Sequence, residues 1–129
     1  MTKYAKCFYI TKSMSDRAYN PYSHYGVGAC AVTKGGKIYK GCNIENASYG
    51  LTICAERVAI FNAVSNGERE FKEIYIATKD GGYPCGACRQ VMAEFCKDDL
   101  MIYLINTTSG EITKTRLGDL LPKAFRLIL

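Results

Sequence analysis

Apolar residues near the N-terminus recur at helical spacing and predict an amphipathic helix over about residues 4–18. Two short runs of apolar or alternating residues follow, at 27–32 and 37–42, and are typical of strands. The Gly35–Gly36 pair between them suits a tight turn that requires a positive φ. The two strands are therefore expected to form a hairpin.

The second half of the pattern predicts a buried helix and a strand–helix–strand unit. Residues 54–64 are apolar nearly all round, which favours a buried helix. The runs 73–78 and 100–105 have the pattern of central strands, and apolar residues between them, over 88–95, share one helix face. A strand, a helix and a strand in that order imply a right-handed parallel crossover.

The C-terminal segment completes the predicted fold. Residues 111–116 have the pattern of an edge strand, and 117–122 that of a short last helix. The element order predicts the α/β class: a three-layer α/β/α domain with a mixed, roughly five-stranded sheet covered on both faces. The 129 residues are expected to form one domain over 1–129.

Composition limits which partners the protein is expected to bind and in which cellular compartment it is expected to act. The net charge is +5, but the basic residues are scattered among acids, so no nucleic-acid groove is predicted. No run approaches the roughly eighteen apolar residues that cross a membrane, and the N-terminus has no signal-peptide pattern. The seven cysteines lack the spacing of a disulfide framework. We expect a cytoplasmic protein whose cysteines are metal ligands or buried thiols.

Three of the cysteines have a spacing suited to a catalytic metal. Zinc favours thiolate ligands, and a catalytic zinc site keeps three protein ligands and one open position. Cys85 and Cys88 are three residues apart, so on the first turn of a helix starting near Pro84 both sulfurs would face the same way. Cys54 would supply the third sulfur from the start of the other helix.

Glu56 stands two residues after Cys54 and is the candidate proton carrier. In a regular helix these two side chains would point to opposite faces. Both can reach one metal-bound water only if Cys54 lies in the cap turn, before the regular helix begins. Zinc acidifies water, and a carboxylate beside it can carry the released proton.

Other uses of the Cys-x-x-Cys pair have to be considered. A redox pair follows a strand and needs neither a third cysteine nor a glutamate. A structural zinc knuckle, or a non-catalytic zinc-stabilised binding module, would have no use for Glu56. The remaining cysteines are expected to be buried and unreactive.

The stretches CAER and PCGACRQ, with AYNPYSHYGVGA, GCNIENASYG and LLPKAF, resemble the small, cysteine-ligated form of the zinc-dependent cytidine deaminases. The resemblance implies one Zn²⁺ per chain, held by Cys54, Cys85 and Cys88, with Glu56 moving protons. It implies hydrolytic deamination of cytidine and deoxycytidine to uridine and deoxyuridine plus ammonia, a reaction of pyrimidine salvage. It also implies a homotetramer.

The resemblance further implies a set of substrate-binding residues. Asn43 and Glu45 would hydrogen-bond the ribose hydroxyls. Tyr25 stands against the base where the family usually has Phe, and the backbone of Ala55 would meet the pyrimidine. Phe125 would reach the active site of a neighbouring subunit and stack on the base. The alternative for Phe125 is packing under the last helix of its own chain.

Arg57 is our candidate for a charge partner of the metal centre. Three thiolates on Zn²⁺ give a net negative centre, and an arginine three residues after Cys54 can hydrogen-bond a sulfur. A surface or salt-bridging arginine is the alternative.

Two other substrate classes are alternatives within the deaminases. An enzyme for another aminopyrimidine, such as a nucleoside antibiotic, shares the zinc motif, but the NIENASYG stretch favours plain nucleosides. An RNA or DNA deaminase would be expected to carry a basic, aromatic-rich groove.

Overall fold

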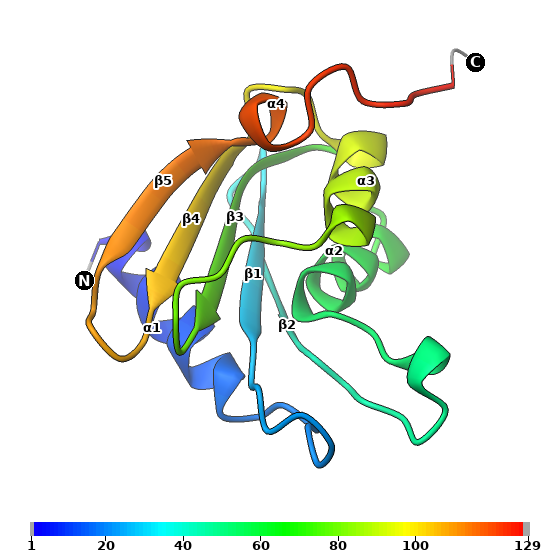
Figure 1. Cartoon of the computed structure of the whole chain (residues 1–129). Helices are drawn as coiled ribbons and strands as arrows, with labels where there is room; N and C mark the ends of the chain where they lie inside the picture. Colours follow the sequence, from blue (N-terminus) through cyan, green and yellow to red (C-terminus); the bar gives the residue numbers. More distant parts are fainter. Residues whose placement is uncertain (1, 128–129) are drawn as a thin grey trace.

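A computed structural model describes residues 2–127 as one five-stranded sheet with helices on both of its faces (Figure 1). The strand order across the sheet is β2-β1-β3-β4-β5. The elements, in chain order, are α1 (Lys3–Ser15), β1 (Gly28–Thr33), β2 (Ile38–Cys42), the 3₁₀ turn η1 (Tyr49–Leu51), α2 (Ala55–Ser65), β3 (Phe71–Thr78), α3 (Gly86–Phe95), β4 (Met101–Asn106), β5 (Ile112–Arg116) and α4 (Leu117–Leu120).

The strand pairing confirms the mixed sheet. β1 and β2 form the predicted antiparallel hairpin, and Gly36 in its turn has a φ of 95°. β1 also pairs antiparallel with β3, whereas β3 and β4 are parallel and are joined through α3. β5 pairs antiparallel with β4 and lies at the edge, as predicted.

Alternate residues of the central strands bury two separate cores. Ile74 and Ile76 of β3 point to the face that carries α2 and α3, where they join a cluster with Cys88 and Met92. Tyr75, between them, points to the opposite face. There it packs with Cys7 of α1 and Tyr103 of β4, whose ring is stacked on Tyr75 at a centroid distance of 4.5 Å. The three-layer α/β/α prediction is therefore confirmed.

Three details differ from the sequence prediction. The first helix ends at Ser15, three residues before Ala18. α2 is buried along one face only, since Phe61 on its other side is 42% exposed. α3 begins at Gly86, so the helix starts after Pro84 rather than at it.

Among residues 2–127, none of the helices is long and apolar enough to cross a membrane.

Gly41 of β2 allows α2 to lie directly against the sheet. A Cβ built on Gly41 would stand 2.5 Å from the carbonyl oxygen of Ala55 and 2.5 Å from the amide nitrogen of Ala59, both backbone atoms of α2. Backbone atoms cannot move aside as a flexible side chain can. The absence of a side chain at Gly41 therefore fixes the height of the first turn of α2 above the sheet.

We predict that Gly41→Ala lowers the free energy of unfolding by about 1–3 kcal/mol, because overpacking forces backbone shifts. Gly50→Ala is the matched control, since a Cβ there meets no atom within 4 Å. Denaturant unfolding of both variants is the measurement. Equal stability of the two would contradict the close approach of α2.

Candidate active site

The three predicted zinc ligands lie at the starts of two helices. Cys54 is the N-cap of α2 and Cys85 the N-cap of α3, both with extended backbone (ψ 153° and 167°). Cys88 lies in the first turn of α3. The cap position of Cys54 is the geometry required for it to share a site with Glu56. Cys85 lies just before its helix rather than within the first turn, yet its sulfur still approaches that of Cys88.

The spacing of the three sulfurs fits a zinc ion. The Sγ atoms of Cys54 and Cys85 are 3.9 Å apart, those of Cys85 and Cys88 are 3.4 Å apart, and all three lie within 4.8 Å of one another. A tetrahedral zinc with Zn–S bonds of about 2.3 Å separates its sulfurs by about 3.8 Å. The residues present therefore fit one zinc ion with a fourth position open.

The charge of the site favours a bound cation. A hydrogen bond from the Cys88 thiol, together with the Arg57 guanidinium, lowers the pKa of the Cys54 thiol to about 5. The pKa of Cys88 is raised, because its thiol hydrogen-bonds the Cys54 sulfur and is buried. The Cys88 thiol therefore keeps its proton instead of adding a second negative charge beside Cys54. A divalent cation that binds the sulfurs can replace this proton.

Arg57 lies beside the thiols, as predicted. Its Nη2 donates a hydrogen bond to the Cys54 Sγ at 3.3 Å, one turn along α2. Its Nε is buried and has no hydrogen-bond partner within the described part of the chain. This contact favours a role beside the thiols over that of a surface arginine, and the role stays a prediction.

Glu56 is a buried acid in the first turn of α2. Its side chain is 4% exposed, and burial raises the pKa of its carboxyl group. A raised pKa lets a carboxylate take up and release a proton nearer neutral pH. Its position also places it on the wall of a pocket.

That pocket has a volume of 260 Å³ and lies at the carboxyl end of β3. Two of the thiols, those of Cys54 and Cys85, line the pocket together with Glu56. Thr78, the last residue of β3, also lines it. An adjoining hollow of 360 Å³ shares Ser23, Glu45 and Thr52 with it. Ligands of open α/β sheets commonly bind at this end of the strands. The lining residues are Ser23, Tyr25, Val27, Asn43, Glu45, Thr52, Ile53, Cys54, Glu56, Ile76, Thr78, Gly82, Tyr83 and Cys85.

Asn43 and Glu45 both line the pocket and both hold the loop before β1. The Asn43 side chain accepts from the Val27 backbone N–H at 2.8 Å and donates to the Tyr25 carbonyl at 2.8 Å. Glu45 accepts from the backbone N–H groups of Tyr22 and Ser23 at 3.0 and 3.1 Å, and from the Ser23 hydroxyl. These bonds lower the pKa of Glu45, which therefore stays ionised.

Of the two residues expected beside the base, Tyr25 lines the pocket and Ala55 does not. Tyr25 is half-buried on the pocket wall, and its hydroxyl donates to the Asp80 Oδ1 at 2.6 Å. Ala55 is fully buried between the lining residues Cys54 and Glu56 but does not itself line the pocket. Its backbone contact with a pyrimidine stays a prediction.

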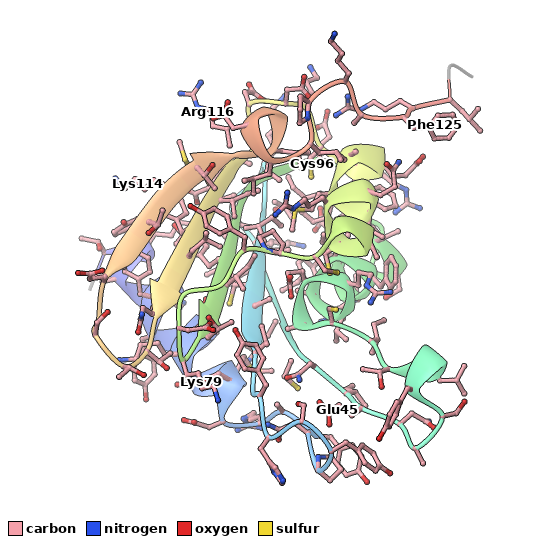
Figure 2. The ribbon with its side chains drawn as sticks, in the orientation of Figure 1. Glu45, Lys79, Cys96, Lys114, Arg116 and Phe125 are labelled. Carbon is pink, nitrogen blue, oxygen red and sulfur yellow. The ribbon has the colours of Figure 1, made fainter. Side chains whose placement is uncertain are left out.

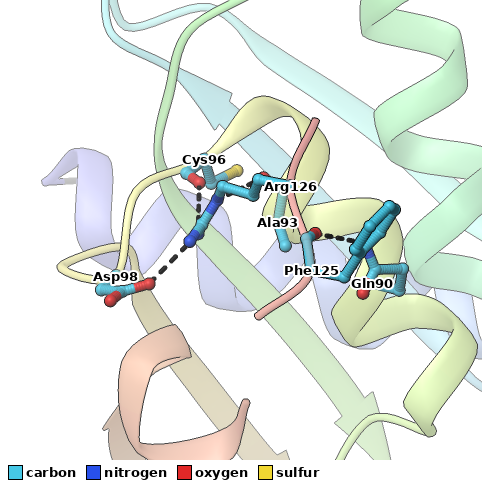
Figure 3. A network of polar contacts seen from close by, with 6 residues as sticks. All are labelled: Gln90, Ala93, Cys96, Asp98, Phe125 and Arg126. Atoms are coloured by element: carbon cyan, nitrogen blue, oxygen red, sulfur yellow. Dashed lines mark hydrogen bonds and ion pairs between the residues drawn. The ribbon is translucent and has the colours of Figure 1, made fainter. Parts of the chain in front are cut away.

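Phe125 lies away from the pocket of its own chain. It and Glu45 are at opposite ends of the molecule (Figure 2). The tail backbone is fastened to α3: Gln90 Nε2 donates to the Phe125 carbonyl at 2.9 Å, and Arg126 Nε donates to the Ala93 carbonyl at 3.0 Å (Figure 3). The Phe125 ring is nevertheless 68% exposed, so it does not pack under its own last helix.

Sequence reasoning missed Ser23, Thr78 and Asp80, which hold the loops around the pocket. None of them belongs to a spacing pattern. Ser23 lies in the loop before β1, and nothing in its local sequence indicates its partner, Glu45.

Fold and site together define a zinc hydrolase class: an α/β/α sheet protein with a three-thiolate metal cluster beside a buried glutamate. The comparisons agree. Residues 1–104 match the model of the cytidine and deoxycytidylate deaminase zinc-binding region, and the chain belongs to this family.

Relatives and solved structures carry the same family name. The chain is 49% identical over 117 residues to a cytidine deaminase of Sporosarcina psychrophila, covering 89% of this chain and 85% of the relative. It is 52% identical over 110 residues to that of Halalkalibacterium halodurans, covering 84% and 83%. The crystal structure of a cytidine deaminase from Burkholderia pseudomallei superposes with a TM-score of 0.89 at 48% identity, covering 97% and 100%.

We predict that each of Cys54→Ser, Cys85→Ser and Cys88→Ser lowers the zinc content well below one ion per chain, because a hydroxyl is a poor zinc ligand. Cys42→Ser should keep its zinc, since Cys42 is a half-buried cysteine outside the cluster. Metal analysis of the purified variants is the measurement. Undiminished zinc in the Cys88 variant would refute the ligand set.

We also predict that Arg57→Ala weakens zinc binding by about 10–100-fold, the usual effect of removing a partner of a metal ligand. Competition with a chromophoric chelator measures it. Arg116→Ala, which changes an exposed arginine on β5, is the control. Wild-type affinity in the Arg57 variant would leave the guanidinium without a role at the metal.

Proposed function

We propose that this protein catalyses the zinc-dependent hydrolytic deamination of cytidine and deoxycytidine, giving uridine or deoxyuridine and ammonia. The observation that carries the proposal is the buried Glu56 on a pocket wall beside the Cys54–Cys85–Cys88 cluster. The similar proteins named above are cytidine deaminases, which supports the same substrate class here. Such a reaction belongs to pyrimidine salvage.

Zinc held by Cys54, Cys85 and Cys88 would supply a Lewis acid that makes water nucleophilic at neutral pH. Glu56 takes the proton that the water loses as it attacks C4 of the cytosine ring. Glu56 then gives this proton to the ring nitrogen N3. It next takes the proton of the new C4 hydroxyl and passes it to the amino group, which leaves C4 as ammonia. Burial excludes bulk water from Glu56 and raises its pKa, which suits a group that alternates between base and acid.

Asn43 and Glu45 are proposed to bind the sugar. Each retains hydrogen-bonding capacity after its bonds to the loop. Asn43 has used one of its two N–H donors, and Glu45 has used three of about four acceptor positions. One free donor and one free acceptor on the pocket wall match a pair of ribose hydroxyls. Tyr25 and Ala55 are proposed to flank the base.

The active unit is proposed to be a homotetramer in which Phe125 completes the pocket of a neighbouring chain. The tail is held to α3 by hydrogen bonds from Gln90 and Arg126, so its position is defined. Its aromatic ring is left in solvent and away from its own pocket. A fixed backbone that presents an exposed ring is suited to contact with another chain.

The protein is proposed to act in the cytoplasm. The metal cluster needs three free thiols, and a reducing compartment keeps them available.

We predict that Glu56→Gln keeps the fold and the zinc but lowers the turnover of cytidine by about 10²–10⁴-fold or more, because an amide cannot carry a proton. The loss of cytidine absorbance on conversion to uridine is the measurement, with metal content and circular dichroism as controls. An inactive wild-type protein with full zinc would refute the proposed function. Near-normal activity of the variant would remove Glu56 from the mechanism.

We predict that inactive chains complement one another if Phe125 acts on a neighbour. Glu56→Gln and Phe125→Ala proteins are mixed, and subunits are allowed to exchange. Some sites then receive Glu56 from one chain and Phe125 from the other, so activity should exceed the sum of the two. Additive activity despite demonstrated exchange, or sedimentation as a monomer, would contradict the shared site.

A further inference from the structure

The Tyr25 hydroxyl is the feature that departs from the family pattern, and the structure gives it a partner. It donates a hydrogen bond of 2.6 Å to the Asp80 Oδ1, across 55 positions of sequence. The bond holds the pKa of Asp80 below its ordinary value, so the carboxylate is charged and the bond is charge-assisted. The ammonium of Lys79, labelled in Figure 2, also lies 5.5 Å from the centre of the Tyr25 ring.

Asp80 belongs to the short loop, residues 79–83, that leads from β3 to the metal ligand Cys85. Its Oδ1 also accepts from the Thr78 hydroxyl at 3.1 Å and from the Gly82 backbone N–H at 3.1 Å. Gly81 has a φ of 70°, and a Cβ on Gly82 would come within 3.1 Å of the Tyr25 hydroxyl oxygen. The loop therefore folds tightly around the end of the Tyr25 side chain.

The backbone of Tyr25 is held from the other side of the pocket. Its N–H donates to the Ser23 hydroxyl oxygen at 3.0 Å, and Ser23 is in turn bound by Glu45. Its carbonyl accepts from Asn43 at 2.8 Å. Tyr25 is thus the one link in this network between the segment that carries Asn43 and Glu45 and the loop that precedes Cys85.

We propose that the Tyr25–Asp80 hydrogen bond is a tether that sets the width of the nucleoside pocket and positions the loop entering Cys85. This inference rests on the proposed function. Tyr25 and Asp80 are positioning residues here, since the Tyr25 hydroxyl donates its one proton to Asp80. Gly82 and Tyr83 of the tethered loop line the pocket, so a loosened loop would weaken nucleoside binding.

The experiment is a double-mutant cycle with Tyr25→Phe, Asp80→Ala and the combined variant. Each single change should raise the KM for cytidine about five- to tenfold, the net effect of one typical hydrogen bond, with a smaller change in kcat. The affinity for uridine, measured by calorimetry, should fall by the same factor. Each change should also speed the transfer of zinc to a chelator, because Cys85 follows the tethered loop.

Two variants separate a tether from general damage. Asp80→Asn keeps an acceptor oxygen and should restore most of the nucleoside affinity, whereas Asp99→Ala changes an exposed aspartate at the other end of the sheet and should have no effect. Thermal unfolding is followed for all variants, because a merely destabilised protein loses kcat through its folded fraction without a change in KM.

The experiments also separate a failure of the tether from a failure of the proposed function. The combined variant should be no worse than Asp80→Ala alone, since Asp80→Ala already removes the bond that Tyr25→Phe removes, together with the bonds from Thr78 and Gly82. Independent effects that multiply, or an unchanged KM and uridine affinity in an active protein, would overturn the tether and leave the proposed function intact. A wild-type protein that does not convert cytidine would overturn the proposed function, and this inference with it.

Discussion

Three cysteine sulfurs meet at one point, where the helices α2 and α3 begin. Sulfurs within 4.8 Å of one another cannot all carry charge without a compensating cation. The fold supplies part of this compensation before a metal binds, because the N-termini of α2 and α3 both point at the cluster. The guanidinium of Arg57 adds a full positive charge at 3.3 Å from Cys54. The pKa of the Cys54 thiol is low because the Cys88 thiol donates a hydrogen bond to its sulfur and because the Arg57 guanidinium lies beside it.

Two helices can begin at the same point only if the sheet brings them there. α3 follows β3 in a parallel crossover, so its start lies at the carboxyl end of that strand. α2 follows the β1–β2 hairpin, and Gly41 lets its backbone descend onto β2. Since Cys54 and Cys85 are caps rather than interior helical residues, their side chains turn toward each other and leave Glu56 room on the pocket wall.

The local parts of this arrangement were predictable from the sequence, and the long-range parts were not. Cysteine spacing, periodicity and the glycine turn are local signals, so they predicted the sheet, the crossover and the cap position of Cys54. The start of α3 was misplaced because Pro84 suits several positions near a helix start. The bonds of Asp80 to Tyr25 and of Glu45 to Ser23 join residues that are 55 and 22 positions apart, and no local pattern indicates either partner.

The C-terminal tail presents a different constraint from that of the thiols. Arg126 uses its guanidinium to hold the carbonyls of Ala93 and Cys96 and the carboxylate of Asp98, so the tail backbone cannot turn inward (Figure 3). Phe125 is left 68% exposed. Three contacts of one arginine thus maintain an aromatic ring in water, where it gains nothing from hydrophobic burial. Because the anchored backbone leaves this ring exposed, Phe125 is available to the neighbouring chain of the proposed homotetramer.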